Sequence, residues 1–242
     1  MAGLTERQVH LLKAIVEEYV ATAEPVGSKA LVEKYKLDIS PATVRNEMAA
    51  MTQEGYLEQP HTSAGRIPAP LGLRYFIRSL MEEEALPVLE EVSIKQRLWN
   101  EREDSVKMLR SAAMALSENT GCLALLTLDE GYVFHAGSVN ILDHPEFYDI
   151  EVTRSVLNIL DKFDLLSEIF SKATSGEEVN VLIGEEIGLA NFEPVGIVFS
   201  RYDSGRVSGS LGVIGPSRLN YPRVIPTVRF FGNLLKEFGG AW

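Results

Sequence analysis

The stretch from Ser40 to Gly55 constrains the fold most, because it has the features of one helix with both ends encoded. Ser40 can accept a hydrogen bond from the first turn, and Pro41 suits the first helical position. Gly55 can adopt the left-handed conformation that closes a helix. Apolar residues recur inside the stretch at helical spacing and predict a buried face: Val44, Met48 and Met51.

The opposite face of this helix is polar and carries Thr43, Arg45, Asn46 and Gln53. Arginine and asparagine side chains have the donor patterns that pair with guanine and adenine in the major groove. The same residue types are common on any exposed helix, so the flanking segments have to decide between a DNA-reading helix and an ordinary surface helix.

The preceding residues predict two further helices. Thr5 and Gln8 have capping-box spacing, and apolar residues then recur at helical intervals to about residue 21. Glu24-Pro25 ends that helix, and Ser28 or its neighbour caps the next one. Two short helices, a tight turn and a third capped helix form a helix-turn-helix pattern.

A hairpin is predicted directly after the third helix. Residues 56–60 read as an edge strand, residues 61–66 as a polar turn, and Ile67-Pro68 as the returning strand. This order is typical of a winged helix. The hydroxyls of Thr62 and Ser63 and the charge of Arg66 suit contact with DNA phosphates. An ordinary hairpin loop is the alternative, and the preceding helix favours the wing.

Charge is unevenly distributed along the chain. The net charge is −11, yet residues 1–80 contain four Lys and five Arg against nine Asp plus Glu and therefore sum to zero. The acidic remainder should repel DNA while the neutral part need not, so we expect modest affinity per subunit and a need for dimerisation. The chain has no apolar run of the roughly 20 residues that a membrane span needs and no secretory signal, which together predict a cytoplasmic protein.

The rest of the chain predicts a second domain with a different architecture. We place a winged-helix DNA-binding domain at residues 1–84, and connector helices with a regulatory and dimerisation domain at residues 85–242. Strands are expected at 122–128, 132–141, 179–183, 195–202 and 207–214, and helices at 150–159, 163–173 and 221–238. Turns at Gly131 and at residues 203–205 join neighbouring strands, which favours an antiparallel sheet. The predicted fold class is α+β.

The sequence predicts neither a catalytic nor a metal site, so no cofactor and no enzymatic activity are expected. The four histidines lack metal-ligand spacing, and Cys122 is alone. Glu185-Glu186 is expected to be a solvated pair. Gly209, Gly212 and Gly215 are read as close-packing or turn glycines. Ser217 and Arg218 could bind an anion, although a helix cap and a solvated arginine are the preferred interpretation.

Five blocks in this order resemble the HrcA-type heat-inducible transcription repressors of bacteria: residues 4–8 (LTERQ), 24–29 (EPVGSK), 40–48 (SPATVRNEM), 55–57 (GYL) and 59–66 (QPHTSAGR). Residues 183–186 (IGEE) and 212–225 (GVIGPSRLNYPRVI) are similar to C-terminal blocks of that family, and residues 143–147 (DHPEF) also match.

The resemblance implies a repressor that binds an inverted-repeat operator upstream of chaperone genes as a homodimer and releases it on heat stress. It further implies a GAF-like second domain and the chaperonin GroEL as a supporting partner. Carried onto this chain, the reading helix starts at Pro41, with Thr43, Arg45 and Asn46 toward the bases. The remaining DNA-binding residues implied are Ser28 and Lys29 on phosphate and His61, Thr62, Ser63 and Arg66 in the wing.

The chain departs from the family's pattern in two places. Ala69-Pro70 stands where the family usually has threonine and an acid. The family also usually carries an inserted segment associated with dimerisation, and here residues 122–128 run on within a few residues to 132–141.

The alternative function is a metabolite-sensing winged-helix regulator whose GAF-like domain binds a ligand. A cavity lined by Phe134, Phe147, Phe199 and Tyr202 would favour that alternative, and a filled core would count against it.

Overall fold

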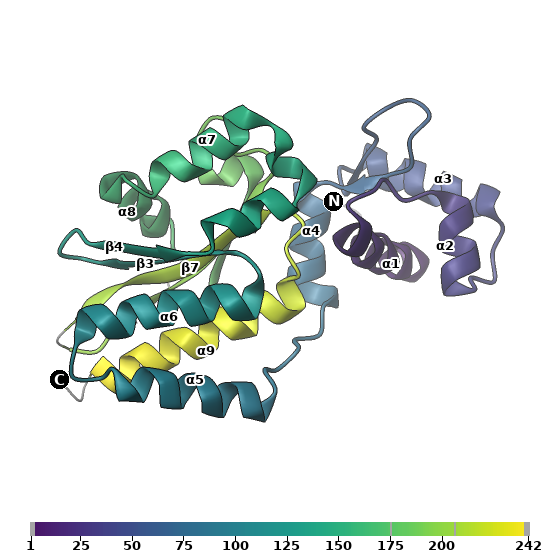
Figure 1. Cartoon of the computed structure of the whole chain (residues 1–242). Helices are drawn as coiled ribbons and strands as arrows, with labels where there is room; N and C mark the ends of the chain where they lie inside the picture. Colours follow the sequence, from purple (N-terminus) through teal and green to yellow (C-terminus); the bar gives the residue numbers. More distant parts are fainter. Residues whose placement is uncertain (1–2, 175, 206, 240–242) are drawn as a thin grey trace. The chain divides into compact units, whose positions relative to one another are not determined.

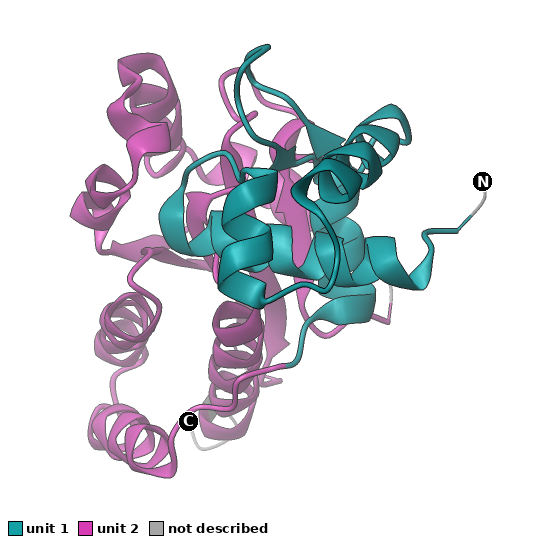
Figure 2. Ribbon diagram, turned by 90° about the vertical axis from the view of Figure 1, so that its right-hand side faces the viewer, with its two compact units in different colours: residues 1–82 teal, residues 83–242 magenta. Residues whose placement is uncertain are grey.

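The computed structural model describes residues 3–174, 176–205 and 207–239, and it divides the chain into two compact units, residues 1–82 and 83–242 (Figures 1 and 2). Within the described parts of the chain, no helix has the combination of length and apolar character that crossing a membrane demands.

The first unit is a winged helix, as the sequence predicts. Its helices are α1 (Glu6–Thr22), α2 (Ser28–Tyr35), α3 (Pro41–Gln53) and α4 (Pro70–Tyr75), and a π-helical turn, η1 (Phe76–Leu80), continues α4. Strands β1 (Leu57–Glu58) and β2 (Ile67–Pro68) pair antiparallel between α3 and α4. The capping box of α1 is present, because Gln8 N–H donates to Thr5 Oγ1 and Thr5 N–H donates to Gln8 Oε1.

The second unit is built on one antiparallel sheet of five strands in the order β4-β3-β7-β6-β5. The strands are β3 (Leu123–Leu128), β4 (Val133–Ala136), β5 (Asn180–Ile183), β6 (Val195–Asp203) and β7 (Ser208–Pro216). Tight hairpins join β3 to β4 and β6 to β7, at the two turns that the sequence predicts. The fold class is therefore α+β, with a winged helix followed by a GAF-like domain.

Helices cover both faces of this sheet (Figures 1 and 2). One face packs on α7 (Ile150–Ile159), α8 (Phe163–Ser171) and the 3-10 turns η2 (Ser138–Asp143) and η3 (Pro145–Tyr148). The other packs on α6 (Ser105–Thr120) and α9 (Tyr221–Gly239), while α5 (Val88–Asn100) lies outside these two helices. A further 3-10 turn, η4 (Gly184–Ile187), follows β5. The sheet is a central layer, and its strand β3 is a nearly continuous apolar run in which all six residues are buried.

One predicted strand is too long. The segment expected at 132–141 forms β4 only to Ala136 and then turns into 3-10 helix. Gly137 makes the turn with φ of 72°, and a Cβ there would lie 1.8 Å from Ser117 Oγ. The strand ends because Gly137 takes this left-handed conformation, and the close approach of Ser117 on α6 leaves no room for a side chain there.

The residues proposed to line a metabolite cavity are largely part of the core. Phe147 and Phe199 are 2% and 0% exposed within one hydrophobic cluster, and Tyr202 is 2% exposed with its hydroxyl donating to Thr127 O at 3.0 Å. Side chains with so little accessible surface are packed in the core and do not line a cavity of metabolite size. Phe134 is partly exposed on β4. The arrangement of these four aromatics counts against the metabolite-sensing alternative.

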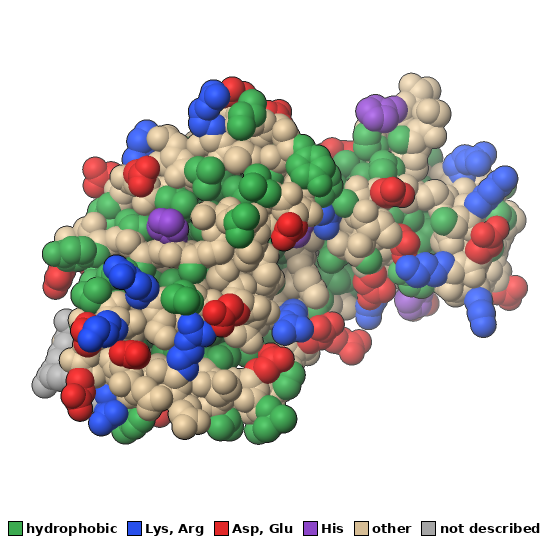
Figure 3. Space-filling model, viewed as in Figure 1, with side chains coloured by type: hydrophobic (Ala, Val, Ile, Leu, Met, Phe, Trp, Pro, Cys, Tyr) green, Lys and Arg blue, Asp and Glu red, His purple; other side chains and the backbone are tan. Residues whose placement is uncertain are grey.

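Charged side chains of both signs are interspersed over the face of the molecule seen in Figure 3. Two short segments of this surface are instead apolar and exposed, on α5 and around η2 to α7.

Candidate nucleic-acid interface

Helix α3 has the ends and the faces that the sequence predicts. Ser40 Oγ accepts a hydrogen bond from Thr43 N–H at 3.1 Å, and Pro41 occupies the first turn. Val44, Met48 and Met51 are at most 3% exposed and fix the helix against the unit's core. The helix gives way to Gly55, whose φ is 82°.

The polar face of α3 leaves Arg45 and Asn46 exposed. Thr43 is half-buried, and its hydroxyl lies 3.0 Å from Ser40 Oγ, so part of its hydrogen-bonding capacity serves the helix start. The neighbouring carboxylate of Glu47 is paired with Arg7 of α1 at 2.6 Å and is 15% exposed. This pairing neutralises the acid that follows Arg45 and Asn46 in the helix.

The wing is anchored to the start of α2 through its backbone. Leu57 pairs with Pro68 and Glu58 with Ile67, and an isolated bridge then joins Arg66 to Val26. The two bridge hydrogen bonds measure 2.8 and 2.9 Å. A Cβ on residue 65 would lie 2.3 Å from Val26 O, so the close approach of these backbones requires Gly65.

Gln59 organises the loop at the tip of the wing. Its Nε2 donates to Thr62 O at 2.9 Å and to Ala64 O at 3.2 Å. The side chains of His61, Thr62 and Ser63 are exposed in this loop. Gln59 is not among the residues predicted from the sequence to form the site; its place at the base of a polar turn is the signal that could have identified it.

Arg66 is directed toward α3 rather than away from the unit. Its Nε donates to Thr52 Oγ1 at 3.0 Å and its Nη1 to Gly65 O at 3.4 Å, and the residue is half-buried. Thr52 in turn donates to Met48 O at 2.8 Å. The Arg66 side chain therefore ties the wing to the third helix.

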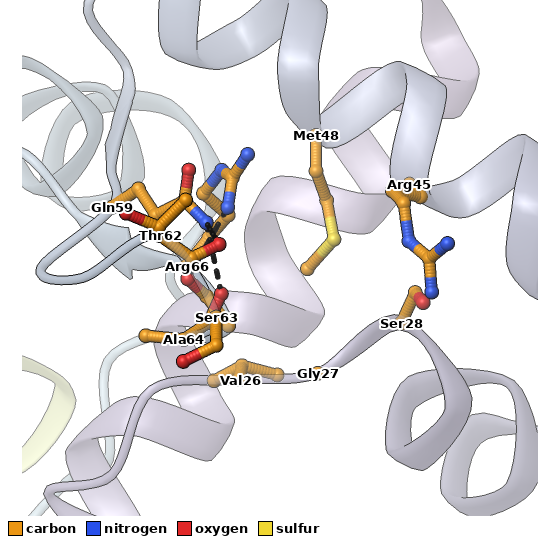
Figure 4. A pocket seen from close by; sticks show the side chains of 11 residues that line it. Val26, Gly27, Ser28, Arg45, Met48, Gln59, Thr62, Ser63, Ala64 and Arg66 are labelled. Carbon is orange, nitrogen blue, oxygen red and sulfur yellow. Dashed lines mark hydrogen bonds between the residues drawn. The ribbon is translucent and has the colours of Figure 1, made fainter.

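A pocket of about 530 Å³ lies between α3, the start of α2 and the wing (Figure 4). Five of the predicted DNA-binding residues line it: Ser28, Arg45, Thr62, Ser63 and Arg66. The others, Lys29, Pro41, Thr43, Asn46 and His61, are not among its lining residues. The other lining residues were not predicted as site residues: Val26, Gly27, Met48, Gln59, Ala64 and Gly65.

The chemistry of this pocket suits an anion. Ser28 is the first residue of α2, behind the N-cap Gly27, and backbone N–H groups of a first helical turn lack intrahelical partners. Figure 4 shows the Arg45 side chain pointing toward Ser28, with the wing residues on the opposite side. A guanidinium, hydroxyls and helix-start N–H groups are the donors that proteins use on DNA phosphates.

Outside this unit, one interpretation from the sequence was wrong. Arg218 is 8% exposed and pairs with Glu146 through Nε–Oε1 at 2.6 Å and Nη2–Oε2 at 3.1 Å, so it is not a solvated arginine. Gly212 is a close-packing glycine as expected, since a Cβ there would lie 2.5 Å from Val198 O. No cluster of three or more potential metal ligands occurs among the residues that the structure describes.

Comparison with known proteins places this architecture in a family. The model of the HrcA protein C-terminal domain matches residues 76–225. A heat-inducible transcription repressor HrcA from Carboxydothermus hydrogenoformans is 30% identical, with 98% of each chain covered. A protein of the same name from Symbiobacterium thermophilum is 28% identical, covering 97% of this chain and 98% of that one.

A crystal structure titled as that of a hypothetical protein has the same fold, with a TM-score of 0.76, 21% identity and 99% of both chains covered. The alignment with the Carboxydothermus protein runs over 339 positions, whereas this chain has 242 residues, so many of those positions have no counterpart here. Because the family model covers more than half of its length, the chain belongs to the HrcA family.

Proposed function

We propose that this protein is a heat-inducible transcription repressor that binds an inverted-repeat operator upstream of chaperone genes as a homodimer. The observation that carries the proposal is the pair Arg45 and Asn46, exposed on a capped helix directly before a wing, in a chain of the HrcA family. The curated relatives bear the name of such a repressor over nearly the whole chain.

In this function α3 enters the major groove. Arg45 can pair in bidentate fashion with a guanine edge and Asn46 with an adenine edge, while Thr43 and Pro41 at the helix start approach the groove floor. Lys29 and the N–H groups at the start of α2 contact phosphate beside Ser28. His61, Thr62 and Ser63 contact the backbone from the wing. Arg66 contributes positive charge, and its bond to Thr52 also holds the wing in place.

We assign DNA binding to residues 1–84 and regulation and dimerisation to residues 85–242. A palindromic operator matches a protein dimer with two-fold symmetry, so a single neutral winged helix reaches useful affinity only in pairs. From the resemblance to the family we also propose that the GroEL chaperonin is a partner that supports the active repressor.

A gel shift tests the proposal. Purified protein is titrated onto an inverted repeat from a chaperone promoter and onto a scrambled duplex, at fixed salt and rising temperature, with and without GroEL. We expect selective binding to the repeat that falls as the temperature rises, before circular dichroism shows global unfolding. Equal affinity for the two duplexes at every temperature, with and without GroEL, would contradict the repressor assignment.

A further inference from the structure

Helix α5 has an exposed apolar face, which we call the α5 outer face. It consists of Val88, Leu89, Val92 and Trp99, which are 73%, 85%, 56% and 48% exposed. Their spacing places them on one side of the helix. In Figure 3 hydrophobic side chains are visible along the lower edge of the molecule, over the position of α5 in Figure 1.

The opposite side of α5 already packs inside the second unit. Ile94 and Leu98 are 4% and 0% exposed, and Arg97 donates to Ser111 and Glu118 of α6. Trp99 also touches Phe238 of α9, with ring centroids 5.5 Å apart. The inner stripe holds α5 in the fold. Val88, Leu89 and Val92 remain largely exposed, whereas part of Trp99 already packs within the unit, against Phe238 and beneath the Arg102 guanidinium.

The centre of the outer face carries no charge, although charged residues make up 24% of the chain. Two cations lie at its margins: Arg102, 4.5 Å from the Trp99 ring centroid, and Lys95, whose Nζ is 5.8 Å from the Phe230 ring centroid. Lys95 is exposed on the same side as Val92 and Trp99, and Glu91 lies one turn earlier along the same edge. Loss of charge around exposed apolar side chains is the compositional feature that distinguishes the centre of a protein interface from the rest of the surface.

We propose that the α5 outer face binds the same face of a second copy of this chain, with the two helices antiparallel about a two-fold axis near Val92 and Gln96. This register places Leu89 of each copy on Trp99 of the other. It also brings Glu91 of each copy within reach of Lys95 of the other, offset by two residues or about 3 Å along the axis, because both residues lie on the same edge of the helix. The face is complementary to itself in apolar contact and in charge, as an isologous interface requires.

The inference deepens the proposed function and rests on it for the biological need of a dimer. A helix of 13 residues is about 20 Å long. A contact of this length buries an area at the low end of specific interfaces, below about 1,200 Å². The free protein should therefore dimerise with a dissociation constant on the order of micromolar, and two operator half-sites would add to the stability of the pair.

Sedimentation velocity on the full chain without DNA tests whether the protein dimerises through the α5 outer face. The wild-type protein is expected to pass from monomer to dimer between about 1 and 100 µM. Leu89→Glu and Val92→Glu each place a charge at the centre of the contact and should raise the dissociation constant on the order of 30-fold or more. The control is Leu142→Glu, the same substitution at a leucine that is 50% exposed on η2; it should leave the dimer intact.

A charge exchange tests the antiparallel register. Glu91→Lys should weaken the dimer, and Glu91→Lys combined with Lys95→Glu should restore it. A monomeric wild-type protein at all concentrations, or a dimer that only Leu142→Glu dissociates, would overturn the inference. Neither result would decide whether the protein prefers the operator, which the gel shift tests separately by comparing the inverted repeat with the scrambled duplex. Circular dichroism confirms that each variant remains folded.

Discussion

Arg218 and Glu146, 72 residues apart in the sequence, form a bidentate ion pair in which the side chains are only 9% and 12% exposed. Glu146 belongs to η3 and Arg218 follows the end of β7. The pair therefore fastens the irregular segment between β4 and α7 to the turn that precedes α9.

Removing one partner of this pair should destabilise the second unit strongly. Arg218→Met leaves the Glu146 carboxylate nearly buried without its counter-charge, so we expect the free energy of unfolding to fall by about 3–5 kcal/mol. Urea denaturation followed by circular dichroism measures the change. The matched control is Arg154→Met, which breaks the exposed pair with Glu151 and should cost less than about 1 kcal/mol. Comparable losses of unfolding free energy in the two variants would show that the buried Arg218–Glu146 pair stabilises the unit no more than an exposed pair does.

Arg45→Ala should weaken binding to the operator far more than binding to random DNA. The guanidinium is exposed on α3, and one bidentate contact to guanine contributes about 1–3 kcal/mol of discrimination, or roughly 10- to 100-fold in affinity. Fluorescence anisotropy on both duplexes at one salt concentration measures the two losses. Arg78→Ala, which removes the same charge from an exposed position of the first unit, serves as control. Equal losses on operator and random DNA for Arg45→Ala would exclude base reading.

Substitutions at Thr52 and at Arg66 can distinguish two roles of Arg66: holding the wing in place through the hydrogen bond to Thr52, and attracting DNA through its charge. Thr52→Val removes the acceptor of the 3.0 Å hydrogen bond and keeps both the helix shape and the Arg66 charge. We expect this variant to lose several-fold in affinity for both duplexes, because the wing is loosened. The slope of the logarithm of affinity against the logarithm of salt concentration should not change, because no phosphate contact is deleted. Arg66→Ala should also weaken both and lower the slope by about one. Wild-type affinity in Thr52→Val would show that the hydrogen bond does not position the wing.

Cys122 should report unfolding of the second unit. It lies directly before β3 and is 5% exposed, and burial raises the pKa of its thiol to about 12. At pH 8 almost no reactive thiolate is present in the native protein, so a disulfide exchange reagent should label it only when the unit opens. Labelling is followed against temperature beside circular dichroism, with Cys122→Ser as the blank. Rapid labelling far below the unfolding transition would reveal local opening of the segment between α6 and β3.

The sequence was sufficient for the features whose causes lie within a few residues. Ser40 and Pro41 begin α3, and Val44, Met48 and Met51 define its buried face, as expected. Hairpins and connector helices were likewise predicted because turn residues and helical periodicity act locally. The family blocks identified the function class, whereas the individual DNA-binding residues remain predictions.

Contacts between distant segments decided the rest. The strand beginning near Tyr132 ends at Ala136, before the left-handed Gly137, where α6 leaves no room for a side chain, and no local pattern contains that contact. Arg218 looks solvated in sequence and is held by Glu146 in the structure, while Arg66 turns toward Thr52 instead of into solvent. A hydrogen bond within one turn is encoded by spacing. The partner of a long polar side chain depends on which segments the fold brings within about 3 Å, and only the tertiary structure determines that.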